Sequence, residues 1–351
     1  MQRSEHRLRA VAIILLLGIG AFLAFRRDPA AISQSRYGYQ PDAEATQRFL
    51  SELEKPMFAQ AGQDCIAKSK QKDTFLYRSA QAVHRQVYGK EWQVVRQTIG
   101  DCVSHGWAHG AWISACVAYE LGELSEAPLM VASEPLYGGS RVEARGRQAG
   151  GWSDGSYGGA AAKWVRDWGV HFRKRYPAQD GGHDLTTYSG QLAKQWGNYG
   201  CGGEGDDGVF DRVAKRHAMR HVALVTNFSE AAAAIESGYC VPVCSSYGFS
   251  SRRDADGFSE RQGTWMHCMV FVGVRHGKRP GLLCLNSWGP TWVSGPKWPD
   301  DQPDGSFWVD ATTATGMLSG RDSFAVGGID GFRYRDLHHK EWFEPTPKEL
   351  R

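Results

Sequence analysis

The stretch RQTIGDCVSHGWAHGAW, residues 96–112, places Cys102 at the start of a run with helical apolar spacing. Asp101 is a residue type that caps helices, so we predict that a helix begins at Cys102. At that position the unsatisfied N–H groups and the positive end of the helix dipole stabilise a thiolate, the reactive form of cysteine. The position therefore suits a nucleophile. A buried structural cysteine is the alternative, because free cysteines are often buried.

A cysteine nucleophile needs a base, and the base needs an orienting partner. His267 is the first residue of an apolar run, HCMVFVGV. Burying a polar side chain at the start of a strand costs free energy unless it has a hydrogen-bond partner, so a functional role is one explanation for it. After the turn RHGKRPG, a second apolar run, LLCLN, ends in Asn286. The two runs predict a β-hairpin that brings His267 and Asn286 to the same end. Taken alone, each residue also fits a structural role, a backbone-bonded histidine or an asparagine in a turn.

The composition is that of a globular protein, with 351 residues, 42% hydrophobic and 23% charged. The formal net charge of +3 gives no strong field, so we expect no nucleic-acid partner. The eight cysteines contain no CxxC pair, which disfavours a zinc site. They are also too sparse for a disulfide scaffold, so the redox compartment stays open.

The N-terminus carries a membrane-type signal. Residues 1–9 are basic, residues 10–25 (AVAIILLLGIGAFLAF) are uncharged, and two arginines follow. Sixteen helical residues span ~24 Å, slightly less than a bilayer core. We interpret this segment as an uncleaved transmembrane anchor rather than a cleaved secretory signal, because RRDPAA offers a poor cleavage site. A buried helix is a third alternative, and arginines on both sides leave the orientation open.

Helical patterns precede β-rich runs along the chain, which predicts an α+β fold. Residues 26–88 are interpreted as a spacer or short pro-region, 89–336 as the main domain and 337–351 as a polar tail. Two Gly-rich stretches, 136–159 and 180–208, are interpreted as loops. Helices are expected at 43–55 after the cap Asp42, at 102–121, at 160–169 and at 229–237 after the cap Ser229, and strands at 239–248, 265–274, 282–286 and 305–310.

Three motifs together resemble the papain-like cysteine peptidases of the papain/cathepsin type. They are Gln97 ahead of GDC, His267 ahead of the VGV strand, and NSWGPTW from Asn286. The resemblance stays collinear over about residues 90–336. It implies a two-lobe fold with a helical lobe and an antiparallel β-barrel-like lobe. It also implies a protein or peptide substrate, and hydrolysis through a thioester acyl-enzyme without a metal or organic cofactor.

The resemblance also implies the role of each site residue. From the N-terminal segment we expect a membrane-anchored protein with an extracytoplasmic catalytic domain, or a secreted protein if the segment is cleaved. The implied roles are Cys102 as nucleophile, His267 as general base and acid, Asn286 as its orienting partner, Gln97 and the Cys102 N–H as oxyanion donors, Trp288 as a shield of the Asn–His bond, and Gly158 and Gly159 beside the substrate backbone.

The chain departs from the family pattern at the nucleophile. Gln97 and Cys102 are five residues apart rather than six, and Val103 stands where many members have Trp. A second alignment makes Cys102 a structural cysteine and puts His105 at the nucleophile position, which implies an inactive enzyme. The intact His–Asn pair favours Cys102. An amidase or transpeptidase, or an inactive papain-like binding or structural module, are the competing functions.

Overall fold

The computed structural model describes residues 37–146, 153–203, 208–328 and 331–337. The chain divides into two units, Met1–Ser35 and Arg36–Arg351, and the fold concerns the second. The expected membrane segment at 10–25 lies outside the described residues, as does nearly all of the 337–351 tail. Within the described ranges, no helix combines the length and apolarity that crossing a bilayer requires.

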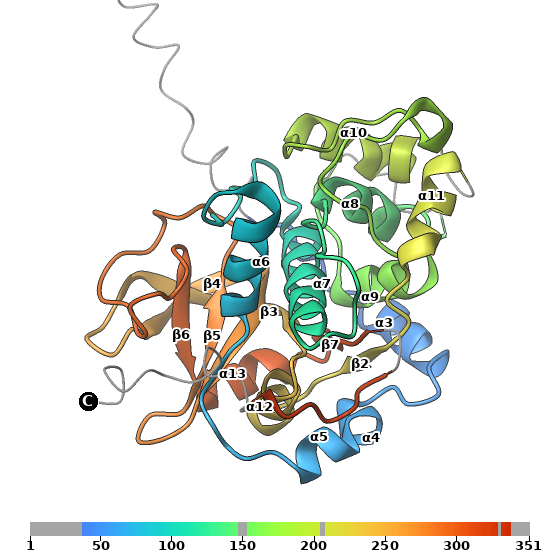
Figure 1. Cartoon of the computed structure of the whole chain (residues 1–351). Coiled ribbons are helices and arrows are strands. Elements are labelled where there is room, and N and C mark those ends of the chain that lie inside the picture. The colour runs from blue at the N-terminus through green and yellow to red at the C-terminus, as the bar shows by residue number, and fades with distance from the viewer. Residues whose placement is uncertain (1–36, 147–152, 204–207, 329–330, 338–351) are drawn as a thin grey trace, which may run out of the picture. The chain divides into compact units, whose positions relative to one another are not determined.

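A group of helices lies on one side of the unit and a sheet on the other, with helix α7 between them (Figure 1). Helix α8 contacts α7, α9 and α10, so it connects this group. The helices on this side are α7 (Cys102–Glu120), α8 (Ser133–Arg141), α9 (Gly158–Asp167), α10 (Gly190–Tyr199) and α11 (Val209–Ala214), with short 3₁₀ turns at Ala178–Asp180, Cys201–Gly203 and Lys215–His217.

Helix α7 is the central element, and all but three of its nineteen residues are buried. A helix that is apolar on every side belongs in a core. Two glycines let it approach the sheet closely. A Cβ atom on Gly106 would lie 2.8 Å from the Met269 carbonyl oxygen, and one on Gly110 would lie 2.9 Å from the Pro242 ring. This contact fixes the start of α7, and with it Cys102, against the sheet.

The main sheet has five antiparallel strands, among which β4 pairs with β1, β3 and β5, and β5 pairs with β6. In the register, Ser245 faces His267 and Cys244 faces Cys268. The strands are β1 (Thr74–Phe75), β3 (Val241–Arg253), β4 (Ser259–Arg275), β5 (Gly281–Leu285) and β6 (Ser306–Asp310), while β2 (Val222–Leu224) and β7 (Phe324–Val326) form a separate antiparallel pair.

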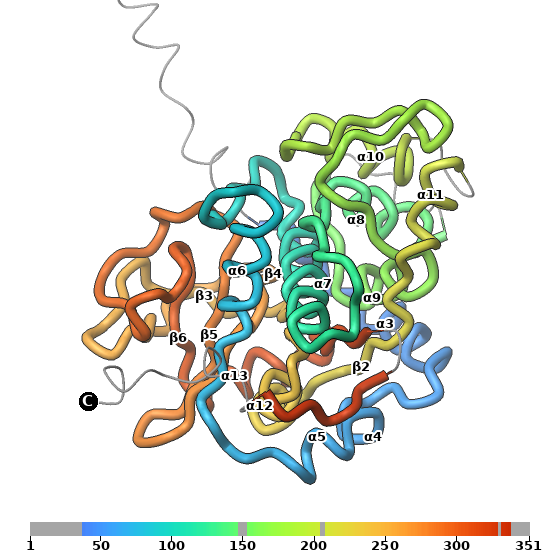
Figure 2. Tube along the Cα trace, in the orientation of Figure 1, coloured from blue at the N-terminus to red at the C-terminus, as the bar shows by residue number. Residues whose placement is uncertain are grey.

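The N-terminal part of the described chain is built into the same unit. Helix α3 (Ala43–Ser51) lies beside α9 (Figure 2), and Asp42 caps it by accepting a 2.9 Å bond from the Ala45 N–H. Residues 43–88, expected to be part of a spacer, are thus folded onto the domain. The other helices are α4 (Phe58–Ala61), α5 (Gln63–Ala67), α6 (Tyr77–Tyr88), α12 (Phe228–Glu236) and α13 (Ala311–Leu318).

The mixed helix-and-sheet class, the helix from Cys102 and the hairpin of β4 and β5 are confirmed. The prediction of loops at 136–159 and 180–208 is wrong, because α8 and α10 occupy parts of them. Their glycines serve close packing: a Cβ on Gly139 would lie 2.2 Å from the Trp164 ring, and one on Gly197 would lie 2.6 Å from Tyr137.

Two predicted caps are also corrected. Helix α12 is capped by Asn227, which accepts a 3.0 Å bond from the Glu230 N–H, rather than by Ser229. Asp101 precedes α7 as expected, but its side chain makes no capping bond. Its carboxylate instead accepts a hydrogen bond from Tyr188.

Candidate active site

The strand β4 and the residue after β5 bring a histidine and an asparagine together. His267 Nε2 lies 2.8 Å from Asn286 Oδ1, and both side chains are buried. The Ser287 N–H donates to the same Oδ1 at 2.7 Å, so this oxygen is the acceptor in both bonds. His267 must therefore carry its proton on Nε2, which leaves Nδ1 as the nitrogen that can take up a proton.

A group of tryptophans encloses this pair. The Trp288 ring is 4.7 Å from the His267 ring and is 8% exposed. Trp265 packs on Trp288 with ring centroids 4.6 Å apart. Such a cover keeps water from the His267–Asn286 bond, and a hydrogen bond is stronger in a low local dielectric.

Gln97 is tied to the loop that follows β5. Its backbone N–H donates to the Ser287 carbonyl at 2.8 Å, and the Ser287 hydroxyl donates to Gln97 Oε1 at 2.5 Å. The Nε2 group donates one of its two hydrogens to the Ile99 carbonyl at 2.9 Å. These bonds fix the orientation of the Gln97 amide. Because Ser287 directly follows Asn286 in the chain, they also hold Gln97 near Asn286.

Cys102 is the first residue of α7 and is fully buried. Backbone groups of Cys268, the residue after His267, and of Gly38 lie close to its thiol. Burial raises the pKa of Cys102 well above the ordinary thiol range, and the Cys268 thiol and the Asp101 carboxylate raise it further. In this state the thiol is therefore neutral.

Residues 37–40, called the strap below, cover this thiol. The Gly38 and Tyr39 N–H groups both donate to the Met266 carbonyl, at 3.2 and 3.1 Å. On the other side, the Ser156 N–H donates to the Gly38 carbonyl and the Gln40 N–H to the Ser156 carbonyl, both at 2.8 Å. The strap thus bridges β4 and the segment before α9, over the start of α7.

The side chains of the strap are also placed against the site. The Tyr37 ring lies edge-on to His267, with centroids 6.4 Å apart, and 5.9 Å from Trp288. Tyr39 is 6% exposed and shares a hydrogen bond with the buried carboxyl of Asp322. Burial raises the pKa of the Tyr39 phenol, so its hydroxyl stays protonated and donates.

Gly158 and Gly159 lie at the first turn of α9 and face Asp322. Their N–H groups donate to its two carboxylate oxygens, at 2.8 and 2.6 Å. A Cβ on Gly158 would lie 2.1 Å from the Asp322 carbonyl oxygen, which explains the glycine there. The backbone pairing with the strap is made by Ser156, two residues before Gly158, and not by the two glycines. The substrate role of the two glycines stays a prediction.

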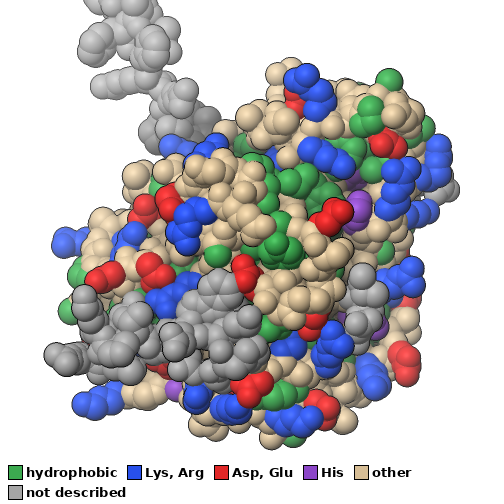
Figure 3. Space-filling view, viewed as in Figure 1, with side chains coloured by type: hydrophobic (Ala, Val, Ile, Leu, Met, Phe, Trp, Pro, Cys, Tyr) green, Lys and Arg blue, Asp and Glu red, His purple; other side chains and the backbone are tan. Residues whose placement is uncertain are grey.

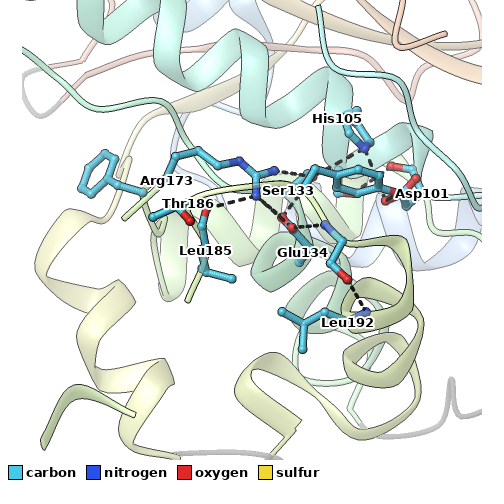
Figure 4. Close-up of polar contacts among 12 residues, drawn as sticks. Asp101, His105, Ser133, Glu134, Arg173, Leu185, Thr186 and Leu192 are labelled. Carbon is cyan, nitrogen blue, oxygen red and sulfur yellow. Dashed lines mark hydrogen bonds and ion pairs between the residues drawn. The ribbon is translucent and has the colours of Figure 1, made fainter. Parts of the chain in front are cut away.

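His105, the nucleophile position in the second alignment, belongs to a different group of side chains (Figure 4). Its Nε2 lies 3.4 Å from Asp101 Oδ2 and 3.5 Å from the Ser133 hydroxyl. Tyr188 connects this group to the loop before Cys102. Its hydroxyl donates to Asp101 Oδ2 at 2.9 Å and accepts from the Thr98 N–H at 3.2 Å. The network holds the loop from which α7 begins.

Helix α8 anchors the other end of that network (Figure 4). Glu134 is completely buried and pairs with Arg173 at 2.8 Å, while Arg173 also donates to the Ser133 hydroxyl at 3.2 Å. The Ser189 N–H donates to Glu134 at 2.9 Å. A buried carboxylate with this many partners is well satisfied, so we interpret the pair as structural.

A separate cavity of about 300 Å³ lies farther along α7. Ala111, Ala115 and Ala118 of that helix line it, together with Glu123 and His217. Figure 3 shows apolar side chains gathered over α7 on this face, beside an acidic and a histidine side chain. Ala115 is thirteen residues beyond Cys102, or ~20 Å along the helix, and none of the predicted site residues lines the cavity.

The strap, Ser156, Ser287 and Asp322 were not expected at the site. The sequence carries a weak signal for some of them. Ser287 adjoins Asn286 in the NSWG motif, and Gly155, with a φ of +127°, precedes Ser156. Nothing in the sequence links Tyr39 to Asp322, because they are far apart in the chain.

Comparison with known proteins supports the fold. The structure resembles xylellain, a cysteine protease from Xylella fastidiosa, with a TM-score of 0.54 and 15% identity, over 85% of this chain and 97% of that one. It also resembles procathepsin B S9 from Trypanosoma congolense, with a TM-score of 0.50 and 10% identity, over 85% and 88% of the two chains. No family model and no curated sequence matches. At this identity the likeness shows the papain-like protease fold alone.

Proposed function

We propose that the protein is a papain-like cysteine peptidase that hydrolyses peptide bonds through Cys102, His267 and Asn286. The observation that carries the proposal is the His267–Asn286 pair at 2.8 Å. The next residue on the strand, Cys268, has its backbone close to the Cys102 thiol. The fold of the two protease structures supports the same class of reaction.

The reaction follows from the placement of the protons. His267 Nδ1 takes the proton of the Cys102 thiol, and the sulfur attacks the carbonyl carbon of the scissile bond. The Gln97 amide and the Cys102 N–H stabilise the oxyanion that forms. His267 then gives this proton to the amine, which leaves, and the acyl part of the substrate remains bound to Cys102 as a thioester. Water, deprotonated by His267, hydrolyses the thioester, and Asn286 holds the imidazole in place throughout.

We also propose that the strap, residues 37–40, inhibits the peptidase activity while it covers Cys102. It covers a thiol whose pKa is raised by burial, so both access and ionisation require that residues 37–40 leave. Once water reaches the thiol, the desolvation penalty falls and the start of α7 stabilises the thiolate.

The experiment is peptide hydrolysis by the full chain, before and after the strap is displaced by substitution. Cys102→Ala is expected to abolish turnover. Cys116→Ala, which changes a buried cysteine farther along the same helix, is the matched control and is expected to retain turnover. Turnover by Cys102→Ala equal to that of the control would reject the proposal.

The expectation of an N-terminal anchor or signal at 10–25 stays a prediction. Anchored protein would resist extraction by high salt and carbonate, and its mature N-terminus would keep Arg3 and Arg7. A mature N-terminus after Phe25 would instead identify a cleaved secretory signal.

A further inference from the structure

Three thiols gather at the candidate nucleophile. Cys244 on β3 and Cys268 on β4 are Cα partners in the antiparallel register. Residues directly opposite each other share a face of the sheet, with Cβ atoms ~4.5–5.5 Å apart. Burial and then the nearby Cys268 thiol raise the pKa of Cys244, while Cys268 Sγ itself donates to the Met269 carbonyl oxygen at 3.7 Å. Cys268 is therefore adjacent both to Cys244 and, in the chain, to His267.

The Cys268 thiol also reaches helix α7. A Cβ atom built on Gly106 would lie 3.1 Å from Cys268 Sγ, so the sulfur is in contact with the helix. Gly106 is one turn after Cys102 and lies on the same helix face. The Cys268 backbone lies close to the Cys102 thiol. Cys268 is thus close to Cys102 and directly opposite Cys244.

All three thiols are buried, and none is in a disulfide. The Cys244–Cys268 pair has the cross-strand spacing that a disulfide spans, since bridged Cα atoms are ~4.4–6.8 Å apart. A reactive thiol beside a second thiol is the arrangement from which a sulfenic acid condenses to a disulfide.

We propose that these three cysteines form a site of reversible oxidative modification, in which Cys268 resolves an oxidised Cys102 and Cys244 completes the exchange. The reactivity of Cys102 rests on the proposed function. The co-reactant is a hydroperoxide, with hydrogen peroxide as its simplest member.

The steps balance. The Cys102 thiolate attacks one peroxide oxygen; an S–O bond forms, the O–O bond breaks and hydroxide leaves, which gives a sulfenic acid. The Cys268 thiol attacks that sulfur, and the S–O bond breaks as the hydroxyl leaves with the thiol proton as water. Cys244 then attacks the Cys268 sulfur, forms the Cys244–Cys268 disulfide and releases the Cys102 thiolate with a proton. An external dithiol returns the pair to thiols.

Two physical reasons favour formation of the Cys244–Cys268 disulfide over irreversible oxidation of Cys102. Without a neighbouring thiol, a sulfenic acid is oxidised further to a sulfinic acid, which thiols do not reverse. With Cys268 held against the same helix as Cys102, the competing reaction is intramolecular, and a reactive group held in place reacts at a high effective concentration. The final disulfide leaves Cys102 reduced, so the site protects the nucleophile.

Cys284 provides a matched control. It is buried on β5 in the same core, near enough that burial and then the Cys268 thiol raise its pKa. Its register partner on β4 is Phe271, not a cysteine, and its sulfur lies 3.6 Å from the Met269 sulfur. Removing the Cys284 thiol leaves all three cysteines of the proposed exchange in place. Cys284→Ala is therefore expected to behave as the parent protein does.

The experiment uses the full chain carrying Gly38→Ala, which is expected to displace the strap and let peroxide reach Cys102, because a Cβ there would lie 1.8 Å from the Gly100 carbonyl oxygen. Samples are treated with equimolar hydrogen peroxide in the presence of dimedone and mapped without reduction by mass spectrometry. The parent is expected to lose about 2 Da and yield peptides linked through Cys268, with little dimedone on Cys102. In Cys268→Ala we expect at least ~fivefold more dimedone adduct on Cys102, and sulfinic acid that dithiothreitol does not reverse.

Cys244→Ala tests the exchange step, because the Cys102–Cys268 disulfide should then accumulate. Equal dimedone labelling of Cys102 in the parent and in Cys268→Ala would overturn the proposal, as would a disulfide that excludes all three cysteines. Circular dichroism of each variant checks the fold. The disulfide readout needs no turnover, so a chain that forms the disulfide but cleaves no peptide refutes the proposed function alone. A chain that cleaves peptides but forms no disulfide refutes this site alone.

Discussion

Gly38→Ala is expected to displace the strap from Cys102. A Cβ atom on Gly38 would lie 1.8 Å from the Gly100 carbonyl oxygen, 2.3 Å from the carbonyl carbon and 2.9 Å from the Cα. Real Cβ contacts are essentially never shorter than 3.0 Å, and these three are backbone atoms that cannot rotate away. The strap must therefore move by more than about 1 Å, which lengthens its bonds to Met266 and Ser156 beyond hydrogen-bonding range.

The size of the effect follows from those bonds. Four backbone hydrogen bonds hold the strap, two to the Met266 carbonyl and two to Ser156. At about 0.5–1.5 kcal/mol each, they favour the closed state by roughly 2–6 kcal/mol. Since 1.4 kcal/mol is a factor of ten, their loss raises the open population roughly 30-fold to 10⁴-fold. A fully buried thiol reacts only from the open state, so its rate of modification should rise by the same factor.

The assay is alkylation of the full chain by iodoacetamide, with the Cys102 peptide quantified by mass spectrometry over time. Gly320→Ala is the matched control, because its Cβ would meet only the Met317 carbonyl oxygen at an ordinary 3.5 Å. We expect the control to react at the wild-type rate. If Gly38→Ala also reacts at that rate while the fold is intact, the strap does not limit access to Cys102 and the reasoning is wrong.

The remaining predictions concern the site and its support. His267→Ala should lower kcat nearly as much as loss of the nucleophile, and Asn286→Ala less, because the residues act as a unit; kinetics of both single variants and the double variant check this. Gln97→Ala should lower kcat roughly 10²–10³-fold, the usual loss for one oxyanion donor, and an unchanged kcat would show that another group fills that role. Burial raises the pKa of Asp322 to about 7, although the Gly158 and Gly159 N–H groups oppose the shift. The folded state thus keeps a proton that the unfolded state releases near pH 4, so this residue's contribution to the free energy of unfolding falls as pH rises from about 4 to about 7. Urea titrations across that range should show the slope, and Asp322→Asn should remove it.

The sequence predicts the central helix and the hairpin well, for physical reasons. Cys102 follows a cap-type residue and precedes a long apolar run, so one helix is the natural outcome. The two apolar runs around RHGKRPG have the length and turn residues of a hairpin, and the hairpin places His267 against Asn286. These features depend on neighbours in the chain, which a sequence displays directly.

Tertiary contacts decide the features that the sequence does not predict. The glycines of α8 and α10 indicate loops by propensity, but Gly139 and Gly197 let these helices approach the aromatic rings of Trp164 and Tyr137 closely. The strap is four residues with no secondary-structure signal, and its position depends on pairing with Met266 and Ser156. The side chain of Asp101 accepts a bond from Tyr188, 87 residues away, rather than from a backbone N–H at the start of the helix.

The central claim is that Cys102 is the nucleophile, and covalent labelling tests it most directly. The full chain carrying Gly38→Ala would be treated with a thiol-directed epoxide, and the labelled peptides would be mapped by mass spectrometry. The account predicts one label per chain, on Cys102, with labelling that falls sharply in His267→Ala, because the imidazole takes up the thiol proton. A label on another residue, or labelling of Cys102 at an unchanged rate without His267, would contradict it.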